Sequence, residues 1–449
     1  MEWSNLQLGS ITELSHNRHV GREELAQSIE ARMRELTQLG ARPGHGLFIY
    51  QQNCSAFFIN LLAGWRLGLC VIPLDAGLPF LAREHLRTSY QPRVIVDPQG
   101  ALQIGAADAF VWPGDSALLL MSSGSTGRAK GILHSRLALQ AKMQSLAQAL
   151  PTADMQRVLC ALPTHFGHGL ICNSLFPLLQ GAHLYLSPPF GPQTIARLDD
   201  LIIRDQIRFF STTPVIWEMI AQFANYRPKP SLKRVHCASA DLLPQHIANM
   251  RAWADGATLW NVYGLTEMLG WISLHQLNDE PFGIGRPWDA EVVLREERLF
   301  VRAPYQMRAY VEMGAQPELR TVAPNDWIST GDLAILQGKG TLQLKGRHDF
   351  LINKGGCKID PQRIEEVCRE YPSVLSAYCF GFPDTLWGEK TGLALETEDN
   401  WCEDEFRRFL TKRLSSLQMP DRILRLSGLP RTARGKVDRE NLRRQALEI

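Results

Sequence analysis

The sequence Met-Ser-Ser-Gly-Ser-Thr-Gly-Arg-Ala-Lys-Gly, residues 121–131, decides how the rest of the chain is interpreted. An apolar run at 117–120 precedes it and predicts a strand, and residues 132–147 predict a short strand followed by a helix. Glycines in such a loop let backbone N–H groups approach an anion, hydroxyls add donors, and Lys130 adds a mobile cation. No Walker A ending, Gly-Lys-Ser/Thr, is present. The alternative for such a cluster alone is a flexible surface loop. We predict a polyphosphate-binding loop made of Ser122, Ser123, Gly124, Ser125, Thr126, Gly127 and Lys130.

Length and composition narrow the class of protein. A chain of 449 residues exceeds what one core usually organises, so two domains are expected. The apolar fraction of 45%, the charged fraction of 21% and the net charge of +2 are those of a soluble globular protein, with no reason to invoke nucleic acid or an anionic membrane surface. Nine cysteines without C-x-x-C spacing favour a reducing cytosol over a disulfide framework or a zinc site.

Neither a signal peptide nor a membrane span is predicted. The first residues, Met-Glu-Trp-Ser, lack the basic and apolar regions of a signal peptide. The most apolar stretch, 56–74, contains Asn60, Gly64 and Arg66, and predicts a buried helix followed by a strand. We therefore expect a cytoplasmic protein.

Strand and helix patterns alternate along most of the chain. Helical periodicity at 21–40 is followed by short apolar runs with helical patterns between them, which predict βαβ units and parallel sheets flanked by helices. These runs are 46–50, 69–74, 93–97, 157–162, 182–186, 208–211, 234–238 and 258–263. From 291 to 344, short turn-linked strands predict a smaller antiparallel or barrel-like portion. We predict an α/β fold with a large domain at 1–347 and a small α+β domain at 348–449.

A second motif, Asn-Val-Tyr-Gly-Leu-Thr-Glu, occupies 261–267. Tyr263 offers a flat ring for stacking on a nucleobase, and Asn261 an amide for an exocyclic amine. Glu267 is a hard oxygen ligand suited to Mg²⁺. The alternative is a strand-to-helix turn with Thr266 as the cap.

Two further motifs carry charge. In Thr-Gly-Asp, 330–332, the Asp332 carboxylate can accept hydrogen bonds from both ribose hydroxyls, although Gly-Asp is also a common turn. The stretch 430–439, Pro-Arg-Thr-Ala-Arg-Gly-Lys-Val-Asp-Arg, is by itself a basic and solvent-exposed loop.

Taken in order, these four motifs resemble those of the adenylate-forming superfamily, which includes acyl- and aryl-CoA synthetases, peptide-synthetase adenylation domains and luciferases. The resemblance covers essentially the whole chain. It implies ATP and Mg²⁺ as cofactors, a hinge at Asp349, a mobile C-terminal domain, and Glu267 and Thr126 at the metal. It makes Lys436 the best catalytic candidate, because a cation stabilises the charge that develops when a carboxylate attacks the α-phosphate.

The resemblance also distributes further roles over the chain. The implied catalytic residues are Lys436, Thr266, Glu267 and Lys130. The implied ATP-binding residues are those of the loop together with Asn261, Tyr263, Gly264, Asp332 and Arg347, and a thiol channel is implied at Gly355 and Gly356.

The acid pocket is expected around residues 162–170, Leu-Pro-Thr-His-Phe-Gly-His-Gly-Leu, which occupy the family's acyl-pocket motif. No aspartate lies between Arg157 and Leu186 to hold a substrate ammonium, which counts against an α-amino acid. The aromatic and glycine residues resemble aryl-acid ligases of the benzoate type. Either histidine could bind a ring hydroxyl or the carboxylate, or could be structural. The expected acid-binding residues are His165, Phe166, His168, Thr213, Ala238, Ser239 and Gly264.

The implied acceptor is a phosphopantetheine thiol, on CoA or on a carrier protein. The Gly-Lys-Val-Asp-Arg ending and the Asn-x-Tyr-Gly wording favour the peptide-synthetase branch and hence an acyl or peptidyl carrier protein as partner. Many CoA ligases carry a lysine where this chain has Asn353. The alternatives are a fatty-acyl or other non-aryl acid, a non-thiol acceptor, and an adenylate-binding scaffold that no longer ligates.

Overall fold

The chain folds into two compact units. The structure, a computed structural model, describes residues 7–123, 129–188, 190–239, 242, 244–277, 283–314, 316–337, 341–347, 352–359, 361–399, 401–430 and 439–448. The first unit comprises Met1–Ala76, Ser89–Met121 and Gly131–His348. The second comprises Gly77–Thr88, Ser122–Lys130 and Asp349–Ile449. A mobile domain at 348–449 stays a prediction.

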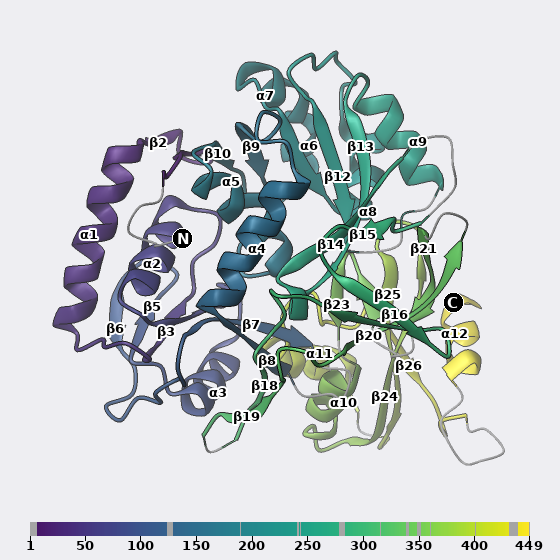
Figure 1. Ribbon diagram of the computed structural model, residues 1–449. Coiled ribbons are helices and arrows are strands. Elements are labelled where there is room, and N and C mark those ends of the chain that lie inside the picture. Colours follow the sequence, from purple (N-terminus) through teal and green to yellow (C-terminus); the bar gives the residue numbers. More distant parts are fainter. Residues whose placement is uncertain are drawn as a thin grey trace. The chain divides into compact units, whose positions relative to one another are not determined.

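The largest sheet of the first unit has nine strands (Figure 1). Its order is β15-β14-β13-β12-β11-β9-β10-β1-β2, with the strands from β13 to β1 parallel and the outer strands antiparallel. The parallel strands are β1 (Ser10–Glu13), β9 (Arg157–Cys160), β10 (His183–Leu186), β11 (Phe209–Thr212), β12 (Arg234–Ala238) and β13 (Thr258–Leu265). The antiparallel ones are β2 (Arg18–Val20), β14 (Gly270–Gln276) and β15 (Arg286–Pro287).

Each face of this sheet packs in a different core, because side chains alternate along a strand. Leu159, Phe210 and Val235 face a core built with four helices, whereas Val158 and Phe209 face the other core. The four helices are α6 (Pro192–Ala196), α7 (Leu198–Arg204), α8 (Pro214–Phe223) and α9 (Pro244–Trp253). The βαβ prediction is confirmed for this part of the chain.

An eight-stranded sheet with the order β19-β18-β8-β7-β4-β3-β5-β6 supplies the second layer. Its strands are β3 (Gly46–Ile49), β4 (Cys70–Pro73), β5 (Val94–Val96), β6 (Leu102–Ile104), β7 (Ser116–Ser123), β8 (Ala129–Ser135), β18 (Ala309–Glu312) and β19 (Glu318–Thr321). The helices of the first unit in this part of the sequence are α1 (Arg22–Gln38), α2 (Ser55–Arg66) and α4 (Arg136–Ala149). Helix α3 (Phe80–Tyr90) lies largely in the segment Gly77–Thr88 of the second unit.

Helix α4 links the two large sheets within the first unit. Ser135 caps it by accepting a hydrogen bond from the Ala138 N–H at 3.0 Å. Leu139, Met143 and Leu146 recur at helical spacing and enter a core that also holds residues of both sheets. The helix therefore connects the strand after the predicted phosphate loop to the nine-stranded sheet.

The predicted antiparallel portion is a four-stranded sheet with the order β16-β17-β20-β21. These strands are β16 (Glu291–Arg295), β17 (Arg298–Arg302), β20 (Ile328–Gln337) and β21 (Thr341–Arg347). Strands β18 and β19, from the same stretch of sequence, extend the eight-stranded sheet instead, with Tyr310 opposite Ile132.

The C-terminal part of the second unit has its own core. Ile364, Val367 and Cys368 of α10 recur at helical spacing and pack with Leu393 and Phe406. The strands are β22 (Ile352–Lys354), β23 (Cys357–Ile359), β24 (Val374–Asp384), β25 (Gly388–Thr397) and β26 (Arg422–Arg425). The helices are α10 (Pro361–Arg369), α11 (Glu403–Thr411) and α12 (Arg439–Glu448).

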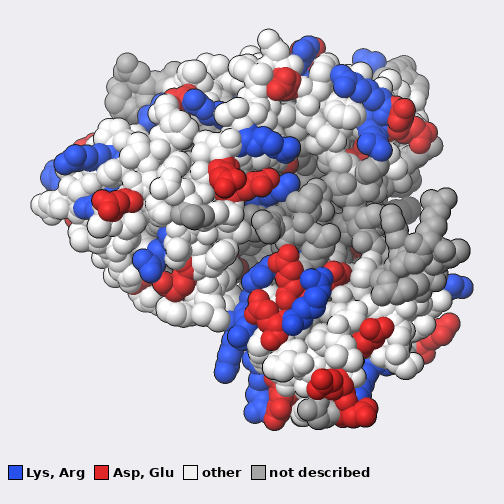
Figure 2. All heavy atoms as spheres, turned by 90° about the horizontal axis from the view of Figure 1, so that it is seen from below, with Lys and Arg blue, Asp and Glu red and all other residues white. Residues whose placement is uncertain are grey.

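The surface drawn in Figure 2 mixes charges of both signs: lysine and arginine are interspersed with aspartate and glutamate among the coloured atoms. Within the ranges given above, no helix combines the length and the hydropathy needed to cross a bilayer.

Candidate active site

The predicted acid-binding residues gather at the carboxyl edge of the nine-stranded sheet. Thr213 follows β11, Ser239 follows β12, Gly264 lies near the end of β13, and 165–168 follow β9. The sheet order β13-β12-β11-β9 makes these four strands neighbours. Ligands of open parallel sheets bind outside this edge, so the fold brings these residues to the place where a substrate would bind.

His168 is the centre of a hydrogen-bonded group at this edge. Its Nδ1 lies 2.9 Å from the Ser239 Oγ, and its Nε2 lies 2.7 Å from the Ser211 Oγ. It is also the first residue of the π-helix η1 (His168–Leu175), a rare form that is frequent at functional sites. Burial lowers the pKa of His168 to about 3, so the ring is neutral at physiological pH. Both ring nitrogens thus have protein partners, and Ser239 is the exposed end of the group.

Aromatic rings line the same region. The Trp271 ring on β14 meets the His168 ring edge-on, with centroids 5.5 Å apart, and approaches the His236 ring at 4.8 Å. The rings of His165 and Phe166 lie 4.1 Å apart, with Phe166 39% exposed. Burial lowers the pKa of His165 to about 4, partly opposed by the charge of Asp75.

Close strand contact explains why residue 264 is a glycine. A Cβ at Gly264 would lie 2.2 Å from the Gly270 carbonyl oxygen, and the β13–β14 pairing shifts register between Tyr263 and Gly264. Gly270 itself has φ +97° and faces the Cys172 Sγ. Bulky side chains are therefore excluded where these two strands reach the site.

A tyrosine–carboxylate contact joins the second and third motifs. The Tyr263 hydroxyl donates to the Asp332 Oδ2 at 2.5 Å, and the Asp332 side chain is only 8% exposed. Arg347 lies directly opposite Asp332 in the β20–β21 pairing. The Asn261 amide donates to the Gly283 carbonyl at 2.9 Å. Residues predicted to bind the adenosine half of ATP, far apart in sequence, are thus neighbours in the fold.

Glu267 lies in the 3₁₀ helix η2 (Thr266–Met268), directly after β13. The Tyr310 hydroxyl donates to the Glu267 Oε1 at 3.4 Å, and burial, with the Glu267 charge, raises the pKa of Tyr310. The Glu267 carbonyl accepts from the Met307 N–H at 2.7 Å. The Glu267 carboxylate, which accepts a hydrogen bond from Tyr310, is a suitable ligand for Mg²⁺. This ion is usually bound by one or two carboxylates, waters and substrate phosphates.

Some predicted residues lie outside the described part of the chain. They are Gly124, Ser125, Thr126, Gly127, Asp349 and Lys436. Ser122 and Ser123 end β7, and Lys130 is the second residue of β8. Gly355 and Gly356 form the turn between β22 and β23 with φ of 61° and 83°, and the Gly355 N–H donates to the Trp387 carbonyl at 2.7 Å.

Two residues of this site were missed from the sequence. Ser211 is the third residue of β11, inside a run that signals only a buried strand. Trp271 lies in β14, four residues beyond Glu267, and nothing in its local sequence distinguishes it from a core tryptophan. Only the pairing of the strands brings both to His168.

The family comparison agrees with this geometry. A family model described as AMP-binding enzyme matches residues 103–310, and one described as AMP-binding enzyme C-terminal domain matches residues 363–436. The chain belongs to the adenylate-forming superfamily of AMP-binding enzymes.

Three similar proteins illustrate the range of the family. An oxalate–CoA ligase of Arabidopsis thaliana is 26% identical, with 93% of this chain and 91% of the ligase covered. The o-succinylbenzoate CoA synthetase of Bacillus subtilis superposes with a TM-score of 0.83 at 20% identity, covering 98% of this chain and 97% of the synthetase. An amide bond synthetase of Marinactinospora thermotolerans superposes with a TM-score of 0.83 at 21% identity, covering 99% of this chain and 98% of the other. At such identities the two structures show the fold alone.

Proposed function

We propose that this protein is an AMP-forming acid–thiol ligase. In the first half-reaction a carboxylate oxygen attacks the α-phosphorus of ATP, and the bond between that phosphorus and the oxygen bridging to the β-phosphate breaks. Pyrophosphate is released, and the acid becomes an acyl-adenylate. In the second, a pantetheine thiol loses its proton, attacks the acyl carbon and releases AMP.

The observation that carries this proposal is the Tyr263–Asp332 hydrogen bond. A ribose needs an acceptor for its two hydroxyls, and a base needs a flat ring beside it. Residues 69 positions apart supply both and are fixed to each other. Glu267, directly after the same strand, would hold Mg²⁺, which would neutralise phosphate charge.

For the acid we propose an aryl carboxylate bearing a hydroxyl or similar polar substituent. The groups found hydrogen-bonded to His168 are hydroxyls, and the ring beside it is that of Trp271. A neutral polar group next to an aromatic face suits an uncharged substituted ring better than a second carboxylate or an ammonium, which would need a counter-charge.

For the acceptor we propose CoA, because the Arabidopsis and Bacillus proteins that this chain resembles are named as CoA ligases. A carrier-protein thiol is the alternative. The family resemblance gives Lys436 the α-phosphate in the first half-reaction and Asp349 the hinge between the two. Asp349→Pro is expected to spare adenylation and block thioester formation; equal loss of both would contradict a hinge there.

Acid-dependent ATP–pyrophosphate exchange tests the proposal. The panel contains benzoates, hydroxybenzoates, cinnamates, dicarboxylates, fatty acids and amino acids. Exchange with a hydroxybenzoate is expected, and Lys436→Ala should reduce it on the order of 10²–10³-fold. Silence across the panel in folded, ATP-binding protein would favour a scaffold that no longer ligates.

A second measurement separates the acceptors. With the best acid, AMP release is followed after adding CoA, a phosphopantetheinylated carrier protein or an amine. Release with CoA supports the proposal, and release with the amine alone would point to amide formation.

A further inference from the structure

A lysine is buried behind the proposed acid pocket. Lys142 lies on α4 and its side chain is 0% exposed. Its ammonium donates to the Trp271 carbonyl oxygen. The Tyr305 ring centroid lies 4.1 Å from the Nζ, and the Trp288 ring centroid 5.4 Å away.

The charge of Lys142 is held by dipoles and ring faces. Among the residues with described side chains, no carboxylate lies within ion-pair distance of its Nζ. Burial lowers the pKa of Lys142 to about 8, partly opposed by Cys172 and Asp289, so the ammonium form dominates at neutral pH. Burying a charge without a counter-ion is costly. A methionine would fill similar space without a charge, so the buried charge of Lys142 needs a functional explanation.

The contacts of Lys142 lead to the pocket. Trp271 pairs with Gly264 across β13 and β14, and its indole meets His168. Cys172 lies on η1, the helix that begins at His168, and its Sγ lies against Gly270, the residue before Trp271. The ammonium therefore lies where the two elements that present the pocket rings meet.

We propose that Lys142 is a positioning residue for the acid: by holding the Trp271 backbone it fixes the Trp271 indole and, through it, the His168 ring. This inference rests on the proposed function. Lys142 touches no substrate in this scheme, and it acts on acid binding but not on ATP binding.

A matched pair of substitutions tests this role. Lys229 is the control, because it is also buried, donates to a tryptophan carbonyl (Trp253, 3.0 Å) and has a tryptophan ring 4.2 Å away. It differs in pairing with Asp199, and its partners Asp199, Arg227 and Trp253 are not pocket residues. The Michaelis constants for the best acid and for ATP are measured by pyrophosphate exchange in Lys142→Met, Lys142→Gln and Lys229→Met.

Lys142→Met is expected to raise the KM for the acid at least tenfold and to change the KM for ATP less than twofold. Lys142→Gln keeps an N–H donor and should stay within about threefold of the wild type for the acid. Lys229→Met should lower the midpoint temperature of thermal unfolding, and it should change the KM for the acid and the KM for ATP by a similar factor. An unchanged acid KM in Lys142→Met, or an equal rise of both constants, would overturn the positioning role.

Wild-type protein provides a test that needs no variant to fold. The titratable groups facing Lys142 are Tyr305, Cys172 and Asp289. Burial raises the pKa of Tyr305, and that of Cys172 to about 11, so between pH 7 and 9.5 Lys142 is the member of this cluster that changes charge. The acid KM should rise about threefold over that range with a steady KM for ATP, and a flat profile would contradict the proposal. If the wild type shows no exchange with any acid, the proposed function fails instead.

Discussion

At the scale of single residues, the sequence predicted side chains of the candidate site but not the contacts between them. Tyr263 and Asp332 were both assigned to adenosine, one as a stacking ring and one as the ribose acceptor. Their mutual hydrogen bond was not predicted, because it depends on how β13 and β20 approach one another. The bond fixes the Asp332 carboxylate, and if Asp332 binds the ribose as proposed, this would reduce the conformational entropy lost on binding ATP.

Substitution of Asp332 should weaken ATP binding. Hydrogen bonds to a charged group contribute about 1.5–3 kcal/mol, so Asp332→Asn is expected to raise the KM for ATP roughly 10–100-fold. Tyr263→Phe keeps the ring and should cost less than tenfold. The KM for ATP is measured by pyrophosphate exchange. Asp326→Asn, an exposed carboxylate on a nearby loop, is the control, and equal effects of the Asp326 and Asp332 changes would refute the ribose assignment.

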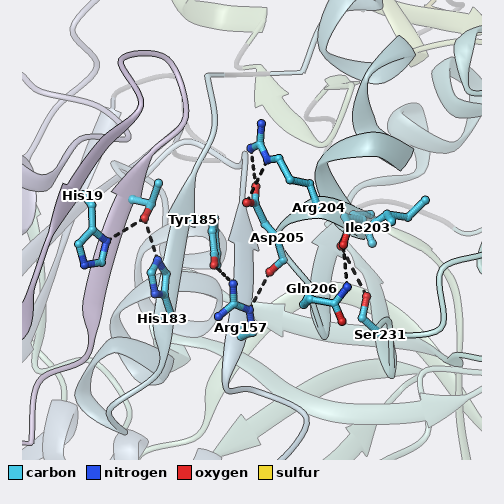
Figure 3. Close-up of polar contacts among 11 residues, drawn as sticks. His19, Arg157, His183, Tyr185, Ile203, Arg204, Asp205, Gln206 and Ser231 are labelled. Carbon is cyan, nitrogen blue, oxygen red and sulfur yellow. Dashed lines mark hydrogen bonds and ion pairs between the residues drawn. The ribbon is translucent and has the colours of Figure 1, made fainter.

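Polar side chains away from the candidate site also form hydrogen-bonded groups. Figure 3 shows such a group at the amino ends of the parallel strands, opposite the pocket edge. The Thr12 hydroxyl lies 2.8 Å from His183 and 3.1 Å from His19, and the Arg157 Nε donates to the Asp205 carbonyl at 2.7 Å. Burial lowers the pKa of His183 to about 4. The Arg157 guanidinium also donates to the Tyr185 hydroxyl on β10, so the group joins β2, β1, β10 and β9 along the sheet, a structural role.

At the scale of elements, apolar runs predicted eight strands of the two large sheets. The eight runs correspond to β3, β4, β5, β9, β10, β11, β12 and β13, with bounds that differ by at most two residues. β1 was missed because Ser-Ile-Thr-Glu is short and has one apolar residue, and its place beside β10 comes from a long-range pairing. Likewise, the strand pattern of β18 could not reveal that its partner is β8.

The β13–β14 contact gives a prediction for these elements. Gly264→Ala would place a Cβ 2.2 Å from a backbone oxygen, so the strands must separate. Overpacking of this kind typically costs about 1–3 kcal/mol. A lower thermal midpoint is expected, with at least a tenfold loss of pyrophosphate exchange. Gly191→Ala is the control, since a Cβ there meets nothing within 4 Å. Normal exchange in Gly264→Ala would show that the close approach is not needed.

At the scale of the whole molecule, burial of neutral histidines affects stability in acid. His134 and His236 are both 0% exposed. Burial lowers the pKa of His134 to about 3 and that of His236 well below its usual value. Between pH 6.5 and 3 the unfolded chain binds more protons than the folded one at His134. Stability is therefore fully present above pH 6.5 and falls as the pH drops.

The expected size of this effect can be measured. At pH 5.5, one histidine with these properties lowers the free energy of unfolding by about 1.3 kcal/mol relative to pH 7. Urea unfolding of His134→Met should show a smaller loss between pH 7 and 5.5 by about that amount. His16→Gln, at a position 76% exposed, should lose as much as the wild type. Parallel losses in all three proteins would assign the acid sensitivity to other groups.

Several buried residues near His168 could not be predicted from the sequence. Motif wording assigned residues to adenosine and to the acid, and the residues assigned to the acid lie at the carboxyl edge of the nine-stranded sheet. It missed Ser211, Trp271 and Lys142, because a buried serine, tryptophan or lysine has the same local sequence in a core as in a pocket wall. Their relation to His168 exists only after three elements have been assembled.

The position of Trp271 has a practical consequence. The Trp271 indole contacts two imidazoles, and the backbone carbonyl of the same residue accepts a hydrogen bond from Lys142, so this natural fluorophore has polar groups close to it that can quench its emission. Anything that displaces either imidazole changes the light it emits. If the acid binds beside His168 as proposed, the emission of Trp271 should report its binding without a label and without turnover, and comparison with Trp271→Phe would separate that signal from those of the other tryptophans.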